Sequence, residues 1–390
     1  MENFNFYSPV RIIFGKDAEK RAGKESIKFG NKVLLHYGGG SIKRTGLYDR
    51  VIKSLKKEKI EVVELGGVKP NPRLSLIREG IELCRREKIE FILAVGGGST
   101  IDSAKTIAAG TPYEGDVWDF FSGNTEVIEK AIPLGVILTI PAAGSEVSPD
   151  MVVTNEDGWY KKSGIASDHL FPKFSILNPE ITYTLSSKDT VIGISDIMAH
   201  IHERYFTLIK NTDLIDRLAE ATLKTVINNA RQIVSDPEDY DSRAEIMWSG
   251  SIAHNDLLGT GKTSDWASHM IEHELSAIYD IPHGEGLAII FPAWMKYVYK
   301  TSIERFAQFA SRVWGADIYL DDLERTALEG ISRMENFFKE IGLPIRLKEI
   351  SISDDRFEEM ASKCSEDGTV GNFRKLGKDD IMEIFKLAVE

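Results

Sequence analysis

Four side chains of metal-binding type occur in this sequence at spacings that could place them around one ion. Asp196 and His200 are four residues apart, so on a helix they project from the same face, one turn apart. His269 lies in an apolar helical pattern, and His283 follows it in a turn rich in proline and glycine. One carboxylate and three imidazoles form a borderline-soft donor set, which suits Fe(II) or Zn(II) and suits Ca²⁺ or Mg²⁺ poorly. The four residues therefore indicate a site for one divalent metal ion.

The distribution of histidine supports a metal site but leaves a simpler interpretation open. Of the eight histidines in the chain, His200 and His202 fall in the first segment, and His269, His273 and His283 fall in the second. A histidine in an apolar helical stripe is more often a core residue, and the spacing Asp-x3-His is short and frequent. From the residues alone, a metal site and a set of core histidines both remain possible.

Length and composition indicate a globular protein of two domains. With 390 residues, the chain exceeds the size at which a single hydrophobic core keeps growing. No window of about 18 consecutive apolar residues occurs, and the N-terminus lacks the basic and apolar segments of a signal peptide. We therefore expect a cytoplasmic protein that has no membrane as partner.

Cysteine content and charge argue against several classes of protein. Cys84 and Cys364 are the only cysteines, and neither belongs to a Cys-x-x-Cys unit, which argues against a disulfide framework or a zinc ribbon. The formal net charge is -12 at pH 7, which argues against a nucleic acid or an anionic membrane as partner. The expected partner is a small molecule.

The pattern of hydrophobic residues changes near residue 185. Before about residue 140, short β-branched runs alternate with amphipathic stretches, as in a parallel sheet with crossover helices. Later segments have helical periodicity almost throughout. We therefore predict an α/β domain over residues 1–184 and an all-helical domain over residues 185–390. The predicted strands are 32–36, 61–65, 91–95 and 135–140, and the predicted helices are 43–58, 73–88, 99–110, 213–234, 242–258, 266–279, 286–299, 323–341 and 379–389.

Two glycine-rich turns follow strands of the predicted sheet. Strand 91–95 leads into Gly96-Gly97-Gly98-Ser99 and a helix, so backbone N–H groups and a helix N-terminus converge where no Cβ obstructs them. The GxGxxG fingerprint is incomplete, because Ile101 takes the third glycine position and the turn follows the third predicted strand instead of the first. Gly38-Gly39-Gly40-Ser41 follows strand 32–36. We therefore predict a dinucleotide-binding domain, with turns that bind no ligand as the alternative.

The residues after strand 32–36 bear on the choice of coenzyme. A carboxylate at the end of such a strand usually binds the adenosine 2′-hydroxyl and repels a 2′-phosphate. Here the strand ends in His36 and Tyr37, with Ser41, Lys43 and Arg44 beyond. Because this turn is neutral and locally basic, we expect NADP(H) to be preferred over NAD(H).

Several motifs together resemble those of the iron-containing (group III) alcohol dehydrogenases. They are Gly-Gly-Gly-Ser-Thr-Ile-Asp-Ser-Ala-Lys at 96–105, Pro-Ala-Ala-Gly-Ser-Glu at 141–146, Asp196-x3-His200 and His269-x3-His273-x9-His283-Gly. The segments at 37–46 and 69–72 further resemble the branch of butanol dehydrogenases and NADPH-dependent aldehyde reductases. The resemblance covers nearly the whole chain. It implies an N-terminal dinucleotide-binding α/β domain and a C-terminal all-helical metal-binding domain, an architecture similar to that of dehydroquinate synthase. It also implies that the bound metal is Fe(II) in preference to Zn(II), and that the protein is a homodimer.

The resemblance also implies roles for individual residues. Asp196, His200, His269 and His283 would hold the metal. The family's commoner Pro-Thr-Thr-x-Gly-Thr-x-x-Glu loop is shorter here, where Ala142 and Ala143 offer no hydroxyl. The implied contacts to the nucleotide are Gly38, Gly39, Ser41, Asn71, Gly97, Gly98, Ser99, Asp102, Thr139, Ser145 and Lys162, the last of which exchanges with Lys161 if the alignment shifts by one residue.

The implied reaction transfers a hydride between NAD(P)H and a primary alcohol/aldehyde pair. A metal held by this donor set acts as a Lewis acid toward a substrate oxygen. A proton must also move, and His273, one turn after His269, is our candidate for its relay because imidazole titrates near neutral pH. His202 points away from the face of His200 and receives no role.

Other functions share part of this pattern. A dehydroquinate synthase-like or glycerol dehydrogenase-like enzyme would also combine NAD with a metal. A lyase that acts on a polyanionic sugar acid phosphate needs several basic residues near the ligands, whereas segments 193–205 and 250–290 supply only Arg204 and Lys262. A catalytically inactive binding protein would be expected to lack a ligand, and none is missing.

Overall fold

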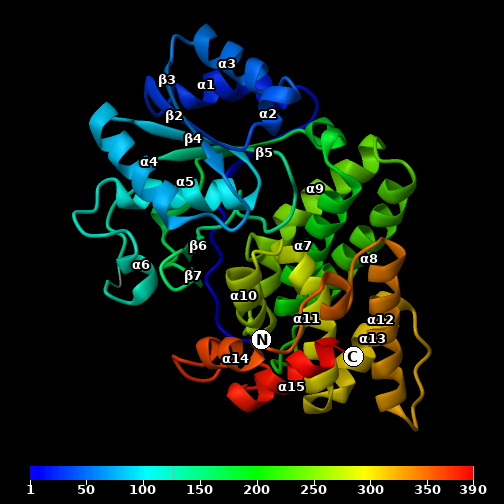
Figure 1. Cartoon of the computed structure of the whole chain (residues 1–390). Helices are drawn as coiled ribbons and strands as arrows, with labels where there is room; N and C mark the ends of the chain where they lie inside the picture. The colour runs from blue at the N-terminus through cyan, green and yellow to red at the C-terminus, as the bar shows by residue number, and fades with distance from the viewer. Residues whose placement is uncertain (126, 390) are drawn as a thin grey trace. The chain divides into compact units, whose positions relative to one another are not determined.

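The computed structural model describes residues 1–125 and 127–389, which form two compact units. One unit is Tyr7–Leu185, and the other is Ser186–Glu390 together with Met1–Phe6 (Figure 1). The predicted boundary assigned the first residues to the α/β domain, whereas they pack with the helical unit. The amino group of Met1 donates to the carbonyl oxygen of Lys210 at 2.7 Å. Hydrogen bonds of the N-terminal backbone thus determine where this segment belongs.

A parallel sheet forms the centre of the unit Tyr7–Leu185. Six strands of the described residues lie in the order β1-β8-β5-β4-β2-β3, all parallel, which confirms the predicted α/β fold. The inner strands β4 and β5 are buried along their whole length, because both faces of a parallel sheet are covered. The strands are β1 (Arg11–Phe14), β2 (Lys32–Gly38), β3 (Glu61–Val68), β4 (Phe91–Gly96), β5 (Leu134–Leu138) and β8 (Phe174–Leu177), and β6 (Val152–Asn155) pairs with β7 (Tyr160–Ser163) in an antiparallel hairpin.

Helices cover both faces of this sheet (Figure 1). Val33, Leu35 and Leu93 pack on one face with residues of α1 and α3. On the other face, His36 reaches Ser103 of α5 at 2.8 Å, because successive side chains of a strand alternate between faces. The helices of this unit are α1 (Ala22–Ser26), α2 (Ser41–Arg44), α3 (Leu47–Lys57), α4 (Leu74–Glu87), α5 (Gly98–Gly110) and α6 (Asp119–Ser122).

Strands β1 and β8 were not predicted from the sequence. Each is four residues long, and so short an apolar run does not distinguish a strand from other buried segments. With β1 included, the turn at Gly96 follows the fourth strand in chain order, not the third.

The second unit is a bundle of helices. Helix α7 begins where the hydroxyl oxygen of Ser186 accepts a hydrogen bond from the backbone N–H of Asp189, an N-cap contact. The helices are α7 (Ser187–Tyr205), α8 (Asp213–Ser235), α9 (Tyr240–His254), α10 (Ala267–Tyr279), α11 (His283–Val298), α12 (Ile303–Trp314), α13 (Leu323–Glu340), α14 (Phe357–Cys364) and α15 (Lys378–Val389).

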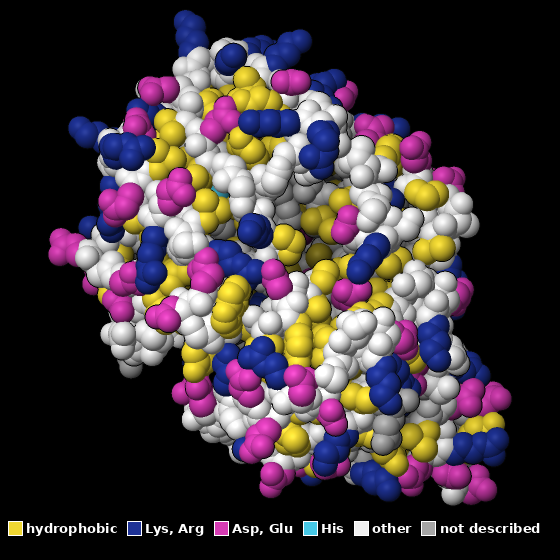
Figure 2. Space-filling view, viewed as in Figure 1, with side chains coloured by type: hydrophobic (Ala, Val, Ile, Leu, Met, Phe, Trp, Pro, Cys, Tyr) yellow, Lys and Arg dark blue, Asp and Glu magenta, His cyan; other side chains and the backbone are white. Residues whose placement is uncertain are grey.

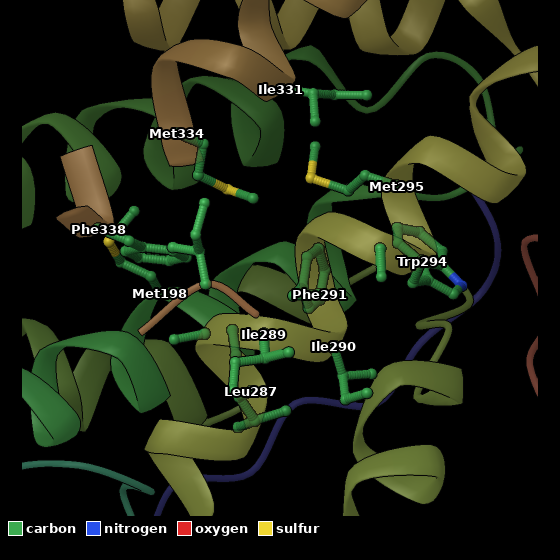
Figure 3. Packing of buried hydrophobic residues seen from close by; sticks show 14 of the residues in the cluster. Met198, Leu287, Ile289, Ile290, Phe291, Trp294, Met295, Ile331, Met334 and Phe338 are labelled. Carbon is green, nitrogen blue, oxygen red and sulfur yellow. The ribbon is translucent and has the colours of Figure 1, made fainter. Parts of the chain in front are cut away.

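The core of the helical unit anchors the two helices that carry most of the predicted ligands. Met198 of α7 packs in one cluster with Phe291 and Trp294 of α11 and with Phe338 of α13 (Figure 3). Met198 lies between Asp196 and His200 in sequence, so its helix presents apolar residues to the core and polar residues to another side. Burial of this cluster therefore fixes the orientation of α7.

On the face seen in Figure 2, Lys and Arg are interspersed with Asp and Glu. Within the described residues, no helix has both the length and the apolar composition needed to cross a membrane. Cys84 and Cys364 are free thiols.

Candidate metal centre and nucleotide-binding turns

Three of the four predicted ligands converge in the helical unit. Donor atoms of Asp196 and His200 from α7 and of His269 from α10 all lie within 4.8 Å of one another, and the three residues are buried. Nε2 of His200 is 3.3 Å from Oδ1 of Asp196. The spacing of four residues on α7 thus places both side chains on one face, as predicted.

His283 lies beside this group as the first residue of α11. The centroid of its ring is 5.2 Å from that of His269. Its donor atom groups within 4.8 Å with those of Glu272 and His273, not with the three buried residues. The sequence placed His283 in a turn, whereas Pro282 acts as the N-cap of a helix that begins at His283.

Two buried polar atoms of the three-residue group have no hydrogen-bond partner among the described residues. They are Oδ1 of Asp196 and Nε2 of His269. Leaving such atoms unpaired in the interior costs free energy, and native proteins rarely do so without a ligand or an ion. One carboxylate and two imidazoles, with these two atoms lacking a hydrogen-bond partner, form a donor set that fits a divalent metal ion.

A buried carboxylate supports His269. Oε1 of Glu203 accepts hydrogen bonds from Nδ1 of His269 at 2.7 Å, from the hydroxyl of Ser268 at 2.6 Å and from the backbone N–H of His269 at 3.2 Å. Its Oε2 accepts from the backbone N–H of Trp266 at 2.6 Å. Glu203 therefore engages Nδ1 of His269, and Nε2 is left without a hydrogen-bond partner among the described residues.

The other two imidazoles also have partners at Nδ1. Glu272, which is buried, bonds Nδ1 of His283 and the hydroxyl of Ser276. Nδ1 of His200 lies 2.8 Å from Nδ1 of His254. Contacts of this kind fix the orientation of the ring and the position of its proton.

Burial controls protonation in this region. Burial lowers the pKa of His200 well below its ordinary value, and the neighbouring His254 lowers it further. Burial, followed by the Glu203 carboxylate, raises the pKa of Asp265 to about 7. A neutral imidazole is the form that binds a metal, so the low pKa of His200 suits a ligand.

Three residues of this site, Glu203, Glu272 and His254, were not predicted from the sequence. Glu203 and Glu272 lie inside the two ligand-bearing helical segments, so an acidic residue in an apolar helical stretch was a usable signal. His254 gave no such signal, because it is 54 residues from His200 in sequence and belongs to a different helix. His202 lies 4.9 Å from the ring of Phe291, away from the ligands, as predicted.

The turn after β4 has no room for a side chain at Gly97. Gly97 is the N-cap of α5, and a Cβ there would lie 2.2 Å from Cγ2 of Ile140. Gly98 and Ser99 form the first turn of α5, whose N–H groups have no partner within the helix. The N–H groups of this first turn and the positive end of the helix fit a pyrophosphate.

The turn after β2 is more open. A Cβ at Gly39 would have no heavy atom within 4 Å, and Gly40 has a φ of 126°. Ser41 is the exposed first residue of α2. This turn therefore has room for the ribose end of a nucleotide.

Asp102 and Ser145 belong to one buried network. The hydroxyl of Ser145 donates to Oδ1 of Asp102 at 2.5 Å and accepts from Nζ of Lys105 at 2.8 Å. Burial raises the pKa of Asp102 to about 6 and lowers the pKa of Lys105, and each charge opposes the shift of the other. Lys105, which was not predicted from the sequence, thus bonds Ser145, and Ser145 in turn bonds Asp102.

Three further predicted contacts lie on separate segments of the same unit. Thr139 donates its backbone N–H to the carbonyl of Gly96 at 3.1 Å, next to the turn after β4. Asn71 is buried and has a φ of 54°. Lys162 is half-buried on β7, while the adjacent Lys161 is buried.

A carboxylate that the sequence analysis did not consider lies near the turn after β2. Glu64 of β3 accepts hydrogen bonds from the hydroxyl groups of Tyr37 at 2.8 Å and Tyr48 at 2.5 Å, and it lies 3.5 Å from Nζ of Lys43. The charge of Lys43 is therefore partly neutralised. Arg44 forms no ion pair among the described residues, and its Nη1 would lie 3.6 Å from a Cβ at Gly40.

Comparison with known proteins decides the family. A model described as iron-containing alcohol dehydrogenase matches residues 9–179, and one described as Fe-containing alcohol dehydrogenase family, C-terminal, matches residues 190–389. The chain belongs to the iron-containing alcohol dehydrogenases. This alcohol dehydrogenase is an NAD(P)-dependent oxidoreductase of the butanol dehydrogenase and aldehyde reductase branch, as its motifs predicted.

The relatives of this alcohol dehydrogenase carry names for both coenzymes. It is 46% identical to a probable NADH-dependent butanol dehydrogenase 2 of Bacillus subtilis, over 100% of both chains. It is 37% identical to the NADPH-dependent aldehyde reductase YqhD of Escherichia coli, over 94% of each chain. The crystal structure of NADH-dependent butanol dehydrogenase A from Thermotoga maritima superposes with a TM-score of 0.96 at 42% identity, covering 100% of this chain and 99% of the other.

Proposed function

We propose that this alcohol dehydrogenase holds one divalent metal ion through Asp196, His200, His269 and His283. The observation that carries the proposal is the pair of buried, unpartnered atoms, Oδ1 of Asp196 and Nε2 of His269, beside Nε2 of His200. His283 completes the set from α11, where its ring adjoins that of His269. The nitrogen-rich set favours Fe(II), the metal of the family's name, and Zn(II) satisfies the same ligands.

The enzyme transfers a hydride between NAD(P)H and a primary alcohol/aldehyde pair. The bound ion supplies Lewis acidity toward the substrate oxygen. His273, whose ring centroid is 5.4 Å from that of His283, stands one helical turn from His269 and is half-buried. We assign His273 the transfer of the proton between the substrate oxygen and solvent, because a partly exposed imidazole can exchange protons with water.

We assign the pyrophosphate to the first turn of α5 and the adenosine ribose to the turn after β2. Gly97 and Gly98 with Ser99 present backbone N–H groups at a helix N-terminus. A Cβ at Gly39 would meet no heavy atom within 4 Å, whereas one at Gly38 would lie 3.4 Å from the carbonyl oxygen of Val68. The remaining assigned contacts to the coenzyme are Ser41, Asn71, Asp102, Thr139, Ser145 and Lys162.

We further propose that NADP(H) is preferred over NAD(H). The support is Arg44, an exposed cation without an ion pair among the described residues, next to the glycines of the turn after β2. Glu64 and the names of the NADH-dependent relatives argue for the other coenzyme. The ratio of the two kcat/KM values decides between them.

The lyase alternative has little support in this site. Arg204 donates to the carbonyl oxygen of His200 and to Asp256, and Nζ of Lys262 lies 2.6 Å from Asp216. Both cations that could have bound a substrate phosphate are therefore engaged within the protein. The names of the relatives, butanol dehydrogenase and aldehyde reductase, favour short aliphatic aldehydes as substrates.

A homodimer and a cytoplasmic location complete the proposal. Phe4, Phe6 and Tyr7 are exposed in the N-terminal segment that precedes the edge strand β1, and apolar side chains of this kind favour an interface between copies. Free thiols at Cys84 and Cys364 agree with a reducing compartment. Light scattering coupled to size-exclusion chromatography measures the oligomeric state, and fractionation of source cells measures the location.

The test of the function is aldehyde-dependent oxidation of NADPH and of NADH by anaerobically purified protein. It is measured with added Fe(II), with added Zn(II) and after chelation. We expect turnover that requires metal and is faster with NADPH at low coenzyme concentration. A protein that binds metal but oxidises neither coenzyme with any of a series of primary aldehydes would overturn the proposal.

A further inference from the structure

The three histidines of the proposed metal site differ in what supports them. Nδ1 of His269 bonds the carboxylate of Glu203, and Nδ1 of His283 bonds the carboxylate of Glu272. His200 instead faces a second imidazole, that of His254. The two rings lie edge to face, with centroids 4.3 Å apart and planes at 79°. His254 is the last residue of α9 and is buried.

The two rings contact each other through the same atom, Nδ1 of each, so one of these two nitrogens must carry the hydrogen of the bond. Nδ1 of His200 and Nδ1 of His254 are 2.8 Å apart, a distance at which one nitrogen carries a hydrogen and the other accepts it. A neutral imidazole has one nitrogen of each kind. Geometry of the two rings alone does not say which nitrogen donates.

Arg204 resolves this choice. Its Nη2 lies 3.3 Å from Nδ1 of His254, and a guanidinium group has donors but no acceptor. Nδ1 of His254 is therefore the acceptor toward Arg204, and it accepts from His200 as well. It follows that His200 carries its proton on Nδ1 and presents the lone pair of Nε2 toward Asp196.

The guanidinium of Arg204 is itself held in place. Nη1 donates to the carbonyl oxygen of His200 at 3.1 Å, and Nη2 also donates to Asp256 at 3.1 Å. Its central carbon lies 4.8 Å from the centroid of the Trp266 ring. Arg204 is buried, so its donors keep these directions. The arrangement links α7, the end of α9 and the start of α10.

We propose that His254, held by Arg204, is a positioning residue that fixes the tautomer of His200 so that Nε2 faces the metal. The inference rests on the proposed metal site. In this proposal His254 acts on the metal site through its contact with His200. Because a neutral imidazole polarises its partner less than a carboxylate does, His200 is the weakest donor of the three histidines.

The test compares variants at position 254 by their affinity for Zn²⁺, measured by competition with a chromophoric chelator. His254→Leu removes the acceptor, and we expect the Kd to rise about 10-fold to 100-fold. His254→Asn keeps an acceptor near the position of Nδ1, and we expect it to restore the Kd to within about threefold of wild type. An unchanged Kd in folded His254→Leu protein, or an Asn variant as weak as the Leu variant, overturns the proposal.

His202→Leu is the matched control. His202 lies on α7, the helix of His200, is buried like His254 and packs against Phe291 and Phe309. We expect its Zn²⁺ affinity to equal that of wild type. A loss as large as that of His254→Leu would mean that any disturbance of α7 weakens the site, and it too overturns the proposal. Circular dichroism of each variant reports whether the protein is folded.

A second measurement does not depend on the folding of any variant. Nitrogen-15 spectra of wild-type protein with labelled histidine, titrated with Zn²⁺, report which ring nitrogen of His200 carries the proton. We expect a protonated Nδ1 in His200 and a protonated Nε2 in His254. The reverse assignment contradicts the proposal, whereas a wild-type protein that binds no Zn²⁺ or Fe(II) contradicts the proposed metal site instead.

Discussion

The carboxylate of Glu203 and the imidazole of His269 are joined by a hydrogen bond of 2.7 Å that spans 66 residues of sequence. Glu203 ends no helix and faces no solvent, yet it accepts four hydrogen bonds, all from residues at the start of α10. A single carboxylate therefore fixes both the helix that carries His269 and the orientation of its ring.

Replacing Glu203 tests this relationship. In Glu203→Gln an NH2 group replaces one carboxylate oxygen and opposes either the N–H of Trp266 or the donors of Ser268 and His269, and the remaining bonds no longer go to a buried charge. We expect the free energy of unfolding to fall by about 2 kcal/mol and the Zn²⁺ affinity to fall about 10-fold to 100-fold. Urea titration and chelator competition measure the two effects. Wild-type affinity in the variant would show that Glu203 does not orient the ligand.

A methyl group should affect stability at one glycine turn and not at the other. In Gly97→Ala the new Cβ would lie 2.2 Å from Cγ2 of Ile140, so we expect both a lower melting temperature and weaker coenzyme binding. In Gly39→Ala the methyl group meets no atom of the free protein, so stability should stay the same. If a nucleotide occupies that space, coenzyme affinity should still fall. Quenching of tryptophan fluorescence gives the affinity, and unchanged coenzyme binding in Gly39→Ala would remove this turn from the coenzyme site.

Arg44 should separate the two coenzymes. A guanidinium bound to the 2′-phosphate contributes about 1.5 kcal/mol or more, so Arg44→Ala should raise KM for NADPH about tenfold or more. KM for NADH, which has no 2′-phosphate, should change little and serves as the control in the same protein. Equal changes in both KM values would mean that Arg44 does not bind the 2′-phosphate.

His36 should make the α/β unit sensitive to acid. Its Nδ1 and Nε2 contact the carbonyl oxygen of Leu65 and the hydroxyl of Ser103, and burial lowers its pKa from 6.5 to about 4. The unfolded chain therefore binds a proton between these values while the folded protein does not, so stability is lost as pH falls from 6.5 to about 4. The loss approaches ~3 kcal/mol at the lower limit.

Urea titrations across this pH range test the contribution of His36. His36→Gln should flatten the dependence, although its stability at neutral pH will also change. His169→Gln, at an exposed position, should leave the dependence as it is in wild type. If the slopes of all three proteins agree, His36 is not the residue that titrates.

Some features followed from local sequence and others did not. Strand β4 and helix α8 were predicted within one or two residues, because a continuous apolar run and a long helical period each fix one type of element. Asp196 and His200 were predicted to face the same way because helical geometry alone decides it. Strand β1, by contrast, is defined only by its pairing with β8, and the contact of His254 with His200 depends on how two helices pack.

The central claim is that Asp196, His200, His269 and His283 hold one divalent ion on which turnover depends. The most direct measurement is the metal content of anaerobically purified wild-type and His269→Ala protein, with coenzyme binding and aldehyde reduction measured on the same samples. We predict one ion per chain in wild type, and loss of both metal and turnover in the variant. NADPH should still bind the variant, because its turns lie in the α/β unit. A variant that retains its metal and reduces aldehydes at the wild-type rate would contradict the account.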